Sequence, residues 1–385
     1  MTVSLEKFDI VIVGSGFFGS TIAERITTTS NLNVAVLESR NHIGGNSYSE
    51  VNDETQIEYH KYGSHLFHTN SEKIWEYCSR FTKFNNYRHK VFTIHNNQMY
   101  SMPINLGTIN QFYKTNYSPE QAKTKITERS HNNADEEILD LESKAISLIG
   151  EDLYNAFIKG YTTKQWQTDP RDLPASIITR LPVRYNYNNE YFDDNFQGIP
   201  VDGYTKWIEK MLAKSTVFLK TDFFDVRNQI REKTIVIYTG PIDRYFGYKY
   251  GELTWRTLDF ELKVVDVNDF QRNSVINYAD LDVPYTRIHE FKHLHPERNY
   301  QSPKTLIMKE FSRFASREDE PYYPVNSATD REKLNKYREL IPDERNVFFG
   351  GRLGSYQYLD MHMAIASALN MFDNEIYPKI KDTLF

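Results

Sequence analysis

The chain has 385 residues, and its 46 Lys and Arg against 52 Asp and Glu give a formal net charge of −6 at pH 7. Since one hydrophobic core rarely grows beyond about 300 residues, we expect two or three domains. The acidic balance predicts no nucleic-acid partner, so any anionic ligand must be bound by local arginines. Cys78 is the only cysteine, which excludes an internal disulfide and a multi-cysteine metal site. No apolar run approaches the length of a membrane span, and we predict a cytoplasmic protein.

The N-terminal residues predict a βαβ unit. Residues 8–13 are apolar and rich in β-branched residues, which is typical of a buried parallel strand, and they lead into a glycine-rich turn at 14–19. A helix is predicted over 20–28, followed by a second buried strand over 33–37 that ends at Glu38. This order is that of a dinucleotide-binding unit.

Each glycine of the turn has a separate physical role. Gly14 makes the tight turn, Gly16 lets the backbone approach a pyrophosphate, and Gly19 lets helix and strand pack closely. Glu38 stands about where a carboxylate accepts hydrogen bonds from an adenosine ribose. Such turns also occur without a ligand, but the complete strand, glycine turn, helix, strand and Glu favours a dinucleotide site.

The segment after Glu38 favours FAD over NAD. Gly44 and Gly45, followed by Asn46, form a second glycine pair after the second strand, which resembles the extension in FAD-binding members of this fold. An ordinary surface turn is the alternative, because Gly-Gly is also a strong turn signal.

Two histidines, His65 and His68, lie three residues apart in the next segment. They could be metal ligands, flavin neighbours or hydrogen-bonded core groups. No third ligand with zinc spacing is near, so no metal site is predicted. A helix over 71–81 and a β-hairpin with strands at 86–94 and 98–102 are predicted to follow.

The middle of the chain, from Asn105 to about Ile178, has a helical pattern, with a long amphipathic segment at 134–149. Phe157 and Tyr161 share one helical face, where they could pack inward or present a stacking surface, and spacing alone favours packing. Arg180 and Arg184, followed by several tyrosines, resemble an anion-binding group, with exposed surface arginines as the alternative.

The last third returns to the nucleotide-binding sheet and adds a second one. Short strands are predicted at 217–220 and 235–238, with a glycine turn directly after the second. Four further strand-like runs predict an antiparallel sheet, at 255–262, 274–278, 286–291 and 305–311.

The C-terminal residues predict a polar helix at 329–340, a last buried strand at 346–349 and an apolar helix at 361–372. Asp360 is the predicted N-cap of the last helix, whose positive end would favour the negative charge of a reduced flavin ring. A plain terminal helix that closes the first domain is the alternative.

Over essentially its whole length the chain resembles the UDP-galactopyranose mutases of the bacterial type. The residues that carry the resemblance lie in eight short segments, at 13–19, 42–46, 62–69, 159–166, 180–184, 283–287, 321–324 and 351–361. Ser64 stands where family members more often have Ala or Pro, which we expect to matter little.

The resemblance implies an α/β fold of three parts. A Rossmann-like FAD-binding domain would be built from the discontinuous segments 1–80, 198–243 and 320–385. A helical substrate domain would span 104–197, and an antiparallel β-sheet domain would combine 81–103 with 244–319. The resemblance also implies a homodimer.

The implied activity is that of an isomerase. A flavoprotein active when its FAD is reduced would interconvert UDP-galactopyranose and UDP-galactofuranose by covalent catalysis through flavin N5, for cell-envelope galactofuranose biosynthesis. The alternative is an FAD-dependent oxidoreductase that acts on a nucleotide sugar or on a small amine or alcohol.

The resemblance finally implies site residues, and no metal among them. The catalytic residues would be Arg180, Arg287, His65 and His68. The substrate would be bound by Phe157, Tyr161, Thr162, Trp166, Arg180, Tyr191, Asn277, Arg287, Tyr323 and Tyr358. The cofactor would be bound by Gly14, Ser15, Gly16, Phe18, Gly19, Glu38, Ser39, Arg40, Gly45, Asn46, His65, Leu66, Arg352, Tyr358, Asp360 and Met361. Arg180 and Arg287 would hold the pyrophosphate, with Tyr161 stacked on the uracil.

Overall fold

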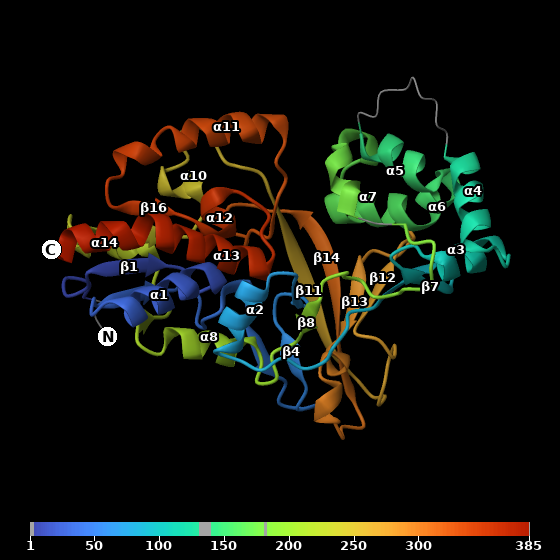
Figure 1. Cartoon of the computed structure of the whole chain (residues 1–385), viewed down its shortest axis with the longest axis horizontal. Coiled ribbons are helices and arrows are strands. Elements are labelled where there is room, and N and C mark those ends of the chain that lie inside the picture. The colour runs from blue at the N-terminus through green and yellow to red at the C-terminus, as the bar shows by residue number, and fades with distance from the viewer. Residues whose placement is uncertain (1–3, 131–139, 181–182, 385) are drawn as a thin grey trace.

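The computed structural model describes residues 4–130, 140–180 and 183–384, without the side chains of residues 176, 179, 180 and 382–384. It has two lobes joined by long strands, and both termini lie on the lobe drawn at the left of Figure 1. In the described residues, no helix combines the length and the apolar character that a membrane crossing requires.

The left lobe contains a five-stranded parallel sheet in the order β16-β10-β1-β2-β9. Its strands are β1 (Ile10–Val13), β2 (Val34–Leu37), β9 (Thr216–Phe218), β10 (Ile235–Tyr238) and β16 (Val347–Phe349). They come from distant parts of the chain, which confirms a Rossmann-like unit assembled from discontinuous segments. The strand predicted at 346–349 is half-buried rather than buried, because β16 is an edge strand of this sheet.

Both faces of this sheet are covered. Ile10 and Ile12 of β1 face one hydrophobic cluster, and Val11 faces another. On the first face, helix α1 (Phe17–Thr29) packs against α8 (Tyr204–Leu212) and α13 (Met361–Met371). Burial on both sides explains why β1 reads as a continuous apolar run.

A seven-stranded sheet joins the lobes, in the order β15-β11-β14-β13-β12-β6-β7. Five of its six neighbouring pairs are antiparallel, but β12 and β6 run parallel, so the predicted purely antiparallel sheet is corrected at this position. The cause is topological, because the β6–β7 hairpin joins the sheet from an early part of the chain. The strands are β6 (Val91–His95), β7 (Gln98–Met102), β11 (Trp255–Val265), β12 (Val275–Tyr278), β13 (Arg287–Glu290), β14 (Thr305–Phe314) and β15 (Tyr323–Pro324).

The right lobe is helical. Its helices are α3 (Leu106–Tyr113), α4 (Pro119–Arg129), α5 (Leu141–Ile149), α6 (Glu151–Leu153) and α7 (Gly160–Trp166), with a π-helical turn at Tyr154–Lys159 between the last two. The helix predicted over 134–149 begins only at Leu141, because the Asp140 carboxylate accepts a hydrogen bond from the amide of Ser143 and caps it. The rest of that prediction, at 134–139, lies outside the described residues.

Short elements complete the structure. Strand β5 pairs with β8 and β3 pairs with β4, both antiparallel. The remaining elements are β3 (Ser49–Val51), β4 (Glu58–His60), β5 (Phe67–Thr69), α2 (Glu72–Ser79), β8 (Phe196–Gly198), α9 (Phe223–Val226), α10 (Ile242–Tyr245), α11 (Ala328–Arg338), α12 (Gly351–Ser355) and α14 (Tyr377–Leu384).

Candidate active site

A cavity of about 760 Å³ lies at the carboxyl edge of the five-stranded sheet, where β1, β2 and β10 end. This edge is where doubly wound sheets bind their ligands. Leu66, Tyr358 and Asp360 do not line the cavity. The other predicted cofactor residues do, namely Gly14, Ser15, Gly16, Phe18, Gly19, Glu38, Ser39, Arg40, Gly45, Asn46, His65, Arg352 and Met361.

The glycines of the first turn fit the roles predicted for them. A Cβ on Gly14 would lie 2.2 Å from Thr239 Oγ1, and one on Gly19 would lie 2.1 Å from the carbonyl oxygen of Gly14. Both positions therefore need glycine for packing within the protein. A Cβ on Gly16 would meet nothing within 4 Å, so the backbone there is open to the cavity. This arrangement fits a dinucleotide whose pyrophosphate approaches Gly16.

Glu38 is held rigidly at the end of β2. Its Oε2 accepts hydrogen bonds from the amide of Ser15 at 3.1 Å and from the hydroxyl of Ser15 at 2.6 Å, and its Oε1 accepts one from the amide of Arg40. The amide of Gly44 donates to the carbonyl of Ser15, so the second glycine loop packs on the first. The two loops thus form one wall, which fits the extension expected of an FAD site.

The cavity also has a wall that the sequence reasoning missed. It includes Thr239, Arg244, Tyr248, Arg317 and Glu320. Thr239 follows β10, and its hydroxyl donates to the carbonyl of Val13 at 2.6 Å. Glu320 forms a 2.6 Å ion pair with Arg40. The glycine turn predicted directly after the strand at 235–238 could have identified Thr239 as a site residue. No sequence pattern marks the other four residues of this wall.

A partly buried polar network lies on the face of the seven-stranded sheet. We call Arg287, Glu310, His289 and Tyr161 the Arg287 cluster. Antiparallel pairing sets Arg287 opposite Glu310. Nε of Arg287 lies 3.2 Å from Glu310 Oε1, the other Glu310 oxygen lies 3.1 Å from His289 Nε2, and Nη2 of Arg287 donates to the hydroxyl of Tyr161. Neither Glu310 nor His289 was predicted.

The electrostatics of the Arg287 cluster favour the charged forms of Glu310 and Arg287. Burial opposes ionisation of Glu310, but the neighbouring Arg287 and His289 outweigh it and lower the Glu310 pKa to about 2. Burial likewise opposes the charge on Arg287, but Glu310 and the tyrosines Tyr161, Tyr323 and Tyr191 raise its pKa above the ordinary value. Burial raises the pKa of Tyr161 to about 12, so its hydroxyl stays protonated.

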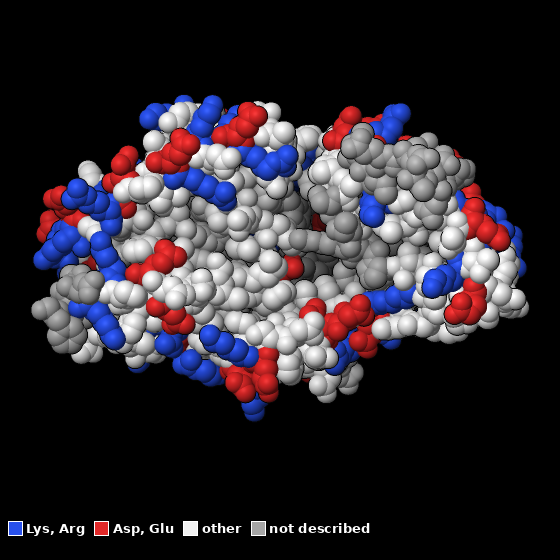
Figure 2. Space-filling model, turned by 45° about the horizontal axis from the view of Figure 1, so that its top comes forward, with Lys and Arg blue, Asp and Glu red and all other residues white. Residues whose placement is uncertain are grey.

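Two further predicted substrate residues, Tyr323 and Tyr358, lie beside Arg352 of the cavity wall. Their rings are 5.9 Å apart, and the Arg352 guanidinium lies 5.9 Å from the Tyr323 ring. Arg352 is 5.0 Å from the Tyr358 ring and donates to the carbonyls of Tyr322 and Leu359. Figure 2 shows the surface hollowed between the lobes, with most charged side chains around the rim.

His65 is a neutral imidazole in the cavity wall. Its Nδ1 donates to the carbonyl of Gly63 at 2.8 Å, and its amide donates to Nδ1 of His60. Burial, together with the nearby Arg352, lowers the pKa of His65 to about 4. At neutral pH its Nε2 is consequently an acceptor.

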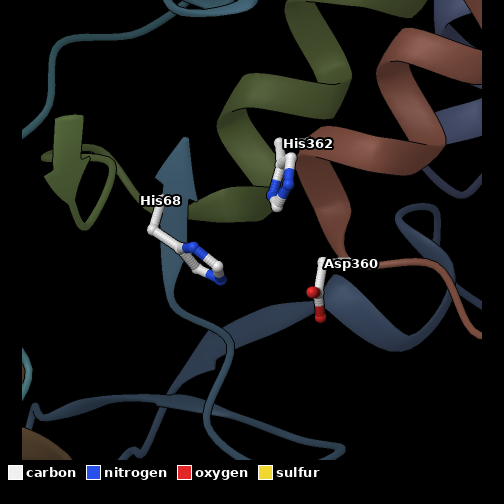
Figure 3. Close-up of side chains that lie close together, drawn as sticks. All are labelled: His68, Asp360 and His362. Atoms are coloured by element: carbon white, nitrogen blue, oxygen red, sulfur yellow. The ribbon is translucent and has the colours of Figure 1, made fainter. Parts of the chain in front are cut away.

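His68 is one of three neighbouring side chains of the kinds that can bind a metal ion. The ligand atoms of His68, Asp360 and His362 lie within 4.8 Å of one another, on β5 and at the start of α13 (Figure 3). Two of these side chains already have protein partners, since His68 Nδ1 lies 2.6 Å from Asp194 and Asp360 accepts from the Tyr358 hydroxyl at 2.7 Å. The absence of a metal remains a prediction.

Asp360 corrects the predicted capping. It occupies the N-cap position of α13, but its side chain makes no capping hydrogen bond within the described residues. The carboxylate turns to the Tyr358 hydroxyl instead.

The predicted uridine residues are spread over the helical lobe and β12. Phe157 is 2% exposed and packs against Tyr100 and Phe112, so it packs inward as its spacing favours. Thr162 is buried, Trp166 is half-buried at the end of α7, and Tyr191 packs edge-on against His89. Asn277 Oδ1 has no hydrogen-bond partner in the described part of the chain. The side chain of Arg180 lies outside that part, so its role remains a prediction.

Comparisons with known proteins agree on one family. Residues 156–358 match the family described as UDP-galactopyranose mutase, and residues 12–81 match the NAD(P)-binding Rossmann-like domain. A probable UDP-galactopyranose mutase of Klebsiella pneumoniae is 41% identical, over 95% of this chain and 94% of the relative. A dTDP-fucopyranose mutase of Escherichia coli is 39% identical, over 94% of this chain and 96% of the relative.

A solved structure of reduced UDP-galactopyranose mutase shares the fold. It superposes with a TM-score of 0.74 at 14% identity, covering 98% of this chain and 94% of that one. Because the family match spans residues 156–358 and the similarity to the bacterial relatives extends over nearly the whole length, the chain belongs to the UDP-galactopyranose mutase family.

Proposed function

We propose that this chain is an FAD-dependent mutase that interconverts UDP-galactopyranose and UDP-galactofuranose. The observation that carries the proposal is the Arg287 cluster, in which a half-buried cation is paired with the buried carboxylate of Glu310. A diphosphate leaving group needs such a fixed positive charge. Membership of the family supports the choice of sugar nucleotide.

Arg287 is prepared to bind the diphosphate. Its contacts to Glu310 and Tyr161 involve Nε and Nη2, and a guanidinium has five N–H donors, so donors remain for phosphate oxygens. The Glu310 carboxylate orients the guanidinium, which lowers the cost of arranging it during reaction. The attraction grows as negative charge collects on the departing UDP.

The cofactor would lie along the wall from Gly16 to Arg352. When bound, reduced FAD supplies the nucleophile, N5, for the anomeric carbon of the sugar. Arg352 is fixed by two backbone carbonyls, and the carboxylate of Asp360 leaves the first amides of α13 to other acceptors. The positive end of that helix would favour an anionic flavin ring. The neutral His65 would accept a proton or hydrogen bond at Nε2.

A second sugar nucleotide deserves a direct comparison. The relative named dTDP-fucopyranose mutase is 39% identical to this chain, close to the 41% of the probable UDP-galactopyranose mutase. These nucleotides differ at the pyrimidine, the 2′ position of the pentose and carbon 6 of the sugar. We therefore keep dTDP-fucopyranose as the alternative substrate.

The test is turnover under reducing and non-reducing conditions. Purified yellow protein is incubated with UDP-galactofuranose or dTDP-fucofuranose, with and without dithionite, and the pyranose is measured by anion-exchange chromatography. We expect conversion of the galactose nucleotide, only in the reduced sample. Faster conversion of the fucose nucleotide would replace the substrate. If neither sugar nucleotide is converted although FAD is bound and reducible, the result would favour the oxidoreductase alternative. Measuring net electron transfer to oxygen or NAD would test that alternative.

The proposal includes three further predictions from the resemblance. They are a cytoplasmic homodimer, a role in cell-envelope galactofuranose biosynthesis, and a division into FAD-binding, helical and sheet domains at the boundaries given above. The buried free thiol of Cys78 fits a reducing compartment. Light scattering during gel filtration tests the dimer, and limited proteolysis tests the domain boundaries.

A further inference from the structure

Lys164 of α7 has an unusual environment. Its ammonium nitrogen lies 2.7 Å from the carbonyl oxygen of Tyr278, 2.8 Å from that of Asp280, 2.9 Å from that of Val283 and 3.1 Å from that of Tyr285. Tyr278 is the last residue of β12, and the other three belong to the connection between β12 and β13. An ammonium has three donors, so four oxygens share them. Rings of backbone carbonyls of this kind are what proteins use to bind K⁺.

This connection needs a cation at its centre. Four carbonyl dipoles that converge on one point repel each other, and a partly buried carbonyl without a partner is costly. Burial lowers the pKa of Lys164 only to about 8, with Asp280 and Asp282 opposing the decrease, so the side chain is charged at neutral pH.

The opposite side of the connection is fixed to the β6–β7 hairpin. His95 Nδ1 lies 2.6 Å from one carboxylate oxygen of Asp280, and the amide of Asn96 donates to the other at 2.8 Å. The amide of Ala279 donates to the carbonyl of Ile94. Lys164 thus joins α7 to a loop that the sheet already holds from behind.

The ends of this connection carry predicted nucleotide residues. Asn277 precedes it in β12, and Arg287 begins β13 directly after it. On the helix side, Tyr161 lies one turn before Lys164 and is bonded to Arg287. Gly160 approaches so closely that a Cβ there would lie 2.2 Å from the carbonyl oxygen of Ala279. Helix α7 therefore meets the connection at Gly160 and Lys164, and it meets the first residue of β13 at Tyr161.

We propose that Lys164 is a positioning residue whose ammonium fills a monovalent-cation site made of backbone carbonyls, and that it thereby fixes Arg287 against Tyr161. The inference rests on the proposed function, because that function assigns these two residues to the nucleotide. Lys164 touches neither substrate nor cofactor in this account. It acts through the geometry of residues 278–287.

The test removes the ammonium and then supplies one from solution. Lys164→Ala leaves the carbonyl ring and a channel where the side chain was. We expect the Kd of UDP and the KM of the sugar nucleotide to rise at least tenfold, with a smaller change in kcat and unchanged FAD absorbance. Ammonium or methylammonium chloride should restore UDP binding. Tetramethylammonium chloride at equal ionic strength should not, because it has no N–H donor.

A matched control comes from the same segment. Lys159 is half-exposed, and its ammonium nitrogen lies 4.0 Å from Glu142 of α5. Lys159→Ala should bind UDP like the unchanged protein, with no response to ammonium. A merely structural lysine would not give rescue that depends on an N–H donor.

Two results would overturn the inference. One is UDP binding by Lys164→Ala within twofold of the unchanged protein, and the other is a loss of binding that neither ammonium nor methylammonium reverses.

If that variant folds poorly, Lys164→Met keeps the aliphatic stem of the side chain. The Tm of Lys164→Met should be higher in ammonium chloride than in tetramethylammonium chloride, and an equal Tm would contradict the site. Failure of the proposed function is distinct, because the unchanged protein would then fail to convert the sugar or to bind UDP or dTDP.

Discussion

The cofactor cavity and the Arg287 cluster are encoded in opposite ways. One wall of the cavity is made of two short stretches, 14–19 and 38–46, whose backbone and glycines form it, and further lining residues come from 221–224, 238–241 and 315–321. The Arg287 cluster takes its members from α7, β13 and β14 and consists of buried and half-buried side chains. A site formed by consecutive residues of one connection can be predicted from the sequence, whereas a site formed by side chains from several separate elements cannot.

The difference also has an energetic side. The backbone amides and glycines of the cavity wall at 14–19 carry no charge, so burying them costs the protein little. The Arg287 cluster buries ionised groups, and Glu310 is only 3% exposed. Because a buried charge must be paired, removing one member there leaves the others uncompensated. We therefore expect substitutions in the cluster to have larger effects than substitutions in the cavity wall.

The largest effect is expected for Arg287→Ala. Loss of the cation should reduce turnover about a thousand-fold, as for removal of a charge-stabilising donor, while FAD stays bound. Leaving Glu310 buried without its partner should also cost about 3–5 kcal/mol of unfolding free energy. Turnover, flavin absorbance and chemical denaturation measure the three quantities. We expect Arg180→Ala to abolish turnover as well with FAD retained.

The control is Arg171→Ala, an exposed arginine paired with Asp169 of its own turn. It should change neither turnover nor stability. Near-normal turnover of Arg287→Ala would remove the residue from the proposed mechanism and would put the substrate site elsewhere.

The second effect is on acid stability. The pKa of Glu310 is about 2 in the folded protein against an ordinary 4.5, so its contribution is present above about pH 4.5 and is lost as the pH falls toward 2. That difference corresponds to about 3 kcal/mol. Thermal unfolding of the FAD-bound protein between pH 5 and 2 should show it. In Glu310→Gln this part of the pH dependence should disappear, and an unchanged slope would contradict the ion pair.

A smaller effect should come from the cavity wall. In Gly16→Ala the new methyl group meets no protein atom but points into open cavity, so FAD affinity should fall by about tenfold or more, or about 1.4 kcal/mol. The Tm of the FAD-free protein should hardly change. Gly19→Ala is the contrasting variant, because its Cβ would collide with the carbonyl of Gly14 and destabilise the fold itself. Equal flavin content in Gly16→Ala and the unchanged protein would rule out the predicted pyrophosphate position.

The smallest effect is expected where the two regions meet. Tyr358→Phe removes the hydroxyl that donates to Asp360 but keeps the ring beside Tyr323 and Arg352. One hydrogen bond is worth about 1 kcal/mol, so kcat/KM should fall about fivefold. Steady-state kinetics with the reduced protein measure this. A loss as large as that of Arg287→Ala would mean that Tyr358 belongs functionally to the Arg287 cluster.

Several elements were predictable because their signals are local. The strand at 235–238 and the second strand of the hairpin, at 98–102, lie where predicted, whereas the first hairpin strand begins at Val91 rather than at 86. The first helix begins at Phe17, three residues before the prediction, because Gly16 is its N-cap. Predictions failed in part where one residue had a choice of partners. Asp360 lies at the predicted N-cap position, but its side chain bonds to Tyr358 rather than to an amide of α13. The segment at 134–149 was predicted as one amphipathic helix, but Asp140 is the N-cap of α5.

By itself the sequence determined the order of strands and helices in the nucleotide-binding unit, its glycine turns and its acidic residue, since each depends on neighbours within a few positions. The tertiary structure decided which side chains from distant segments lie opposite one another. Alternation along a strand predicts which face a side chain takes, but only strand register sets Glu310 across from Arg287, 23 residues away in sequence. The same holds for Lys164, because no local sequence pattern predicts its contact with four backbone carbonyls that lie more than 100 residues later in the chain.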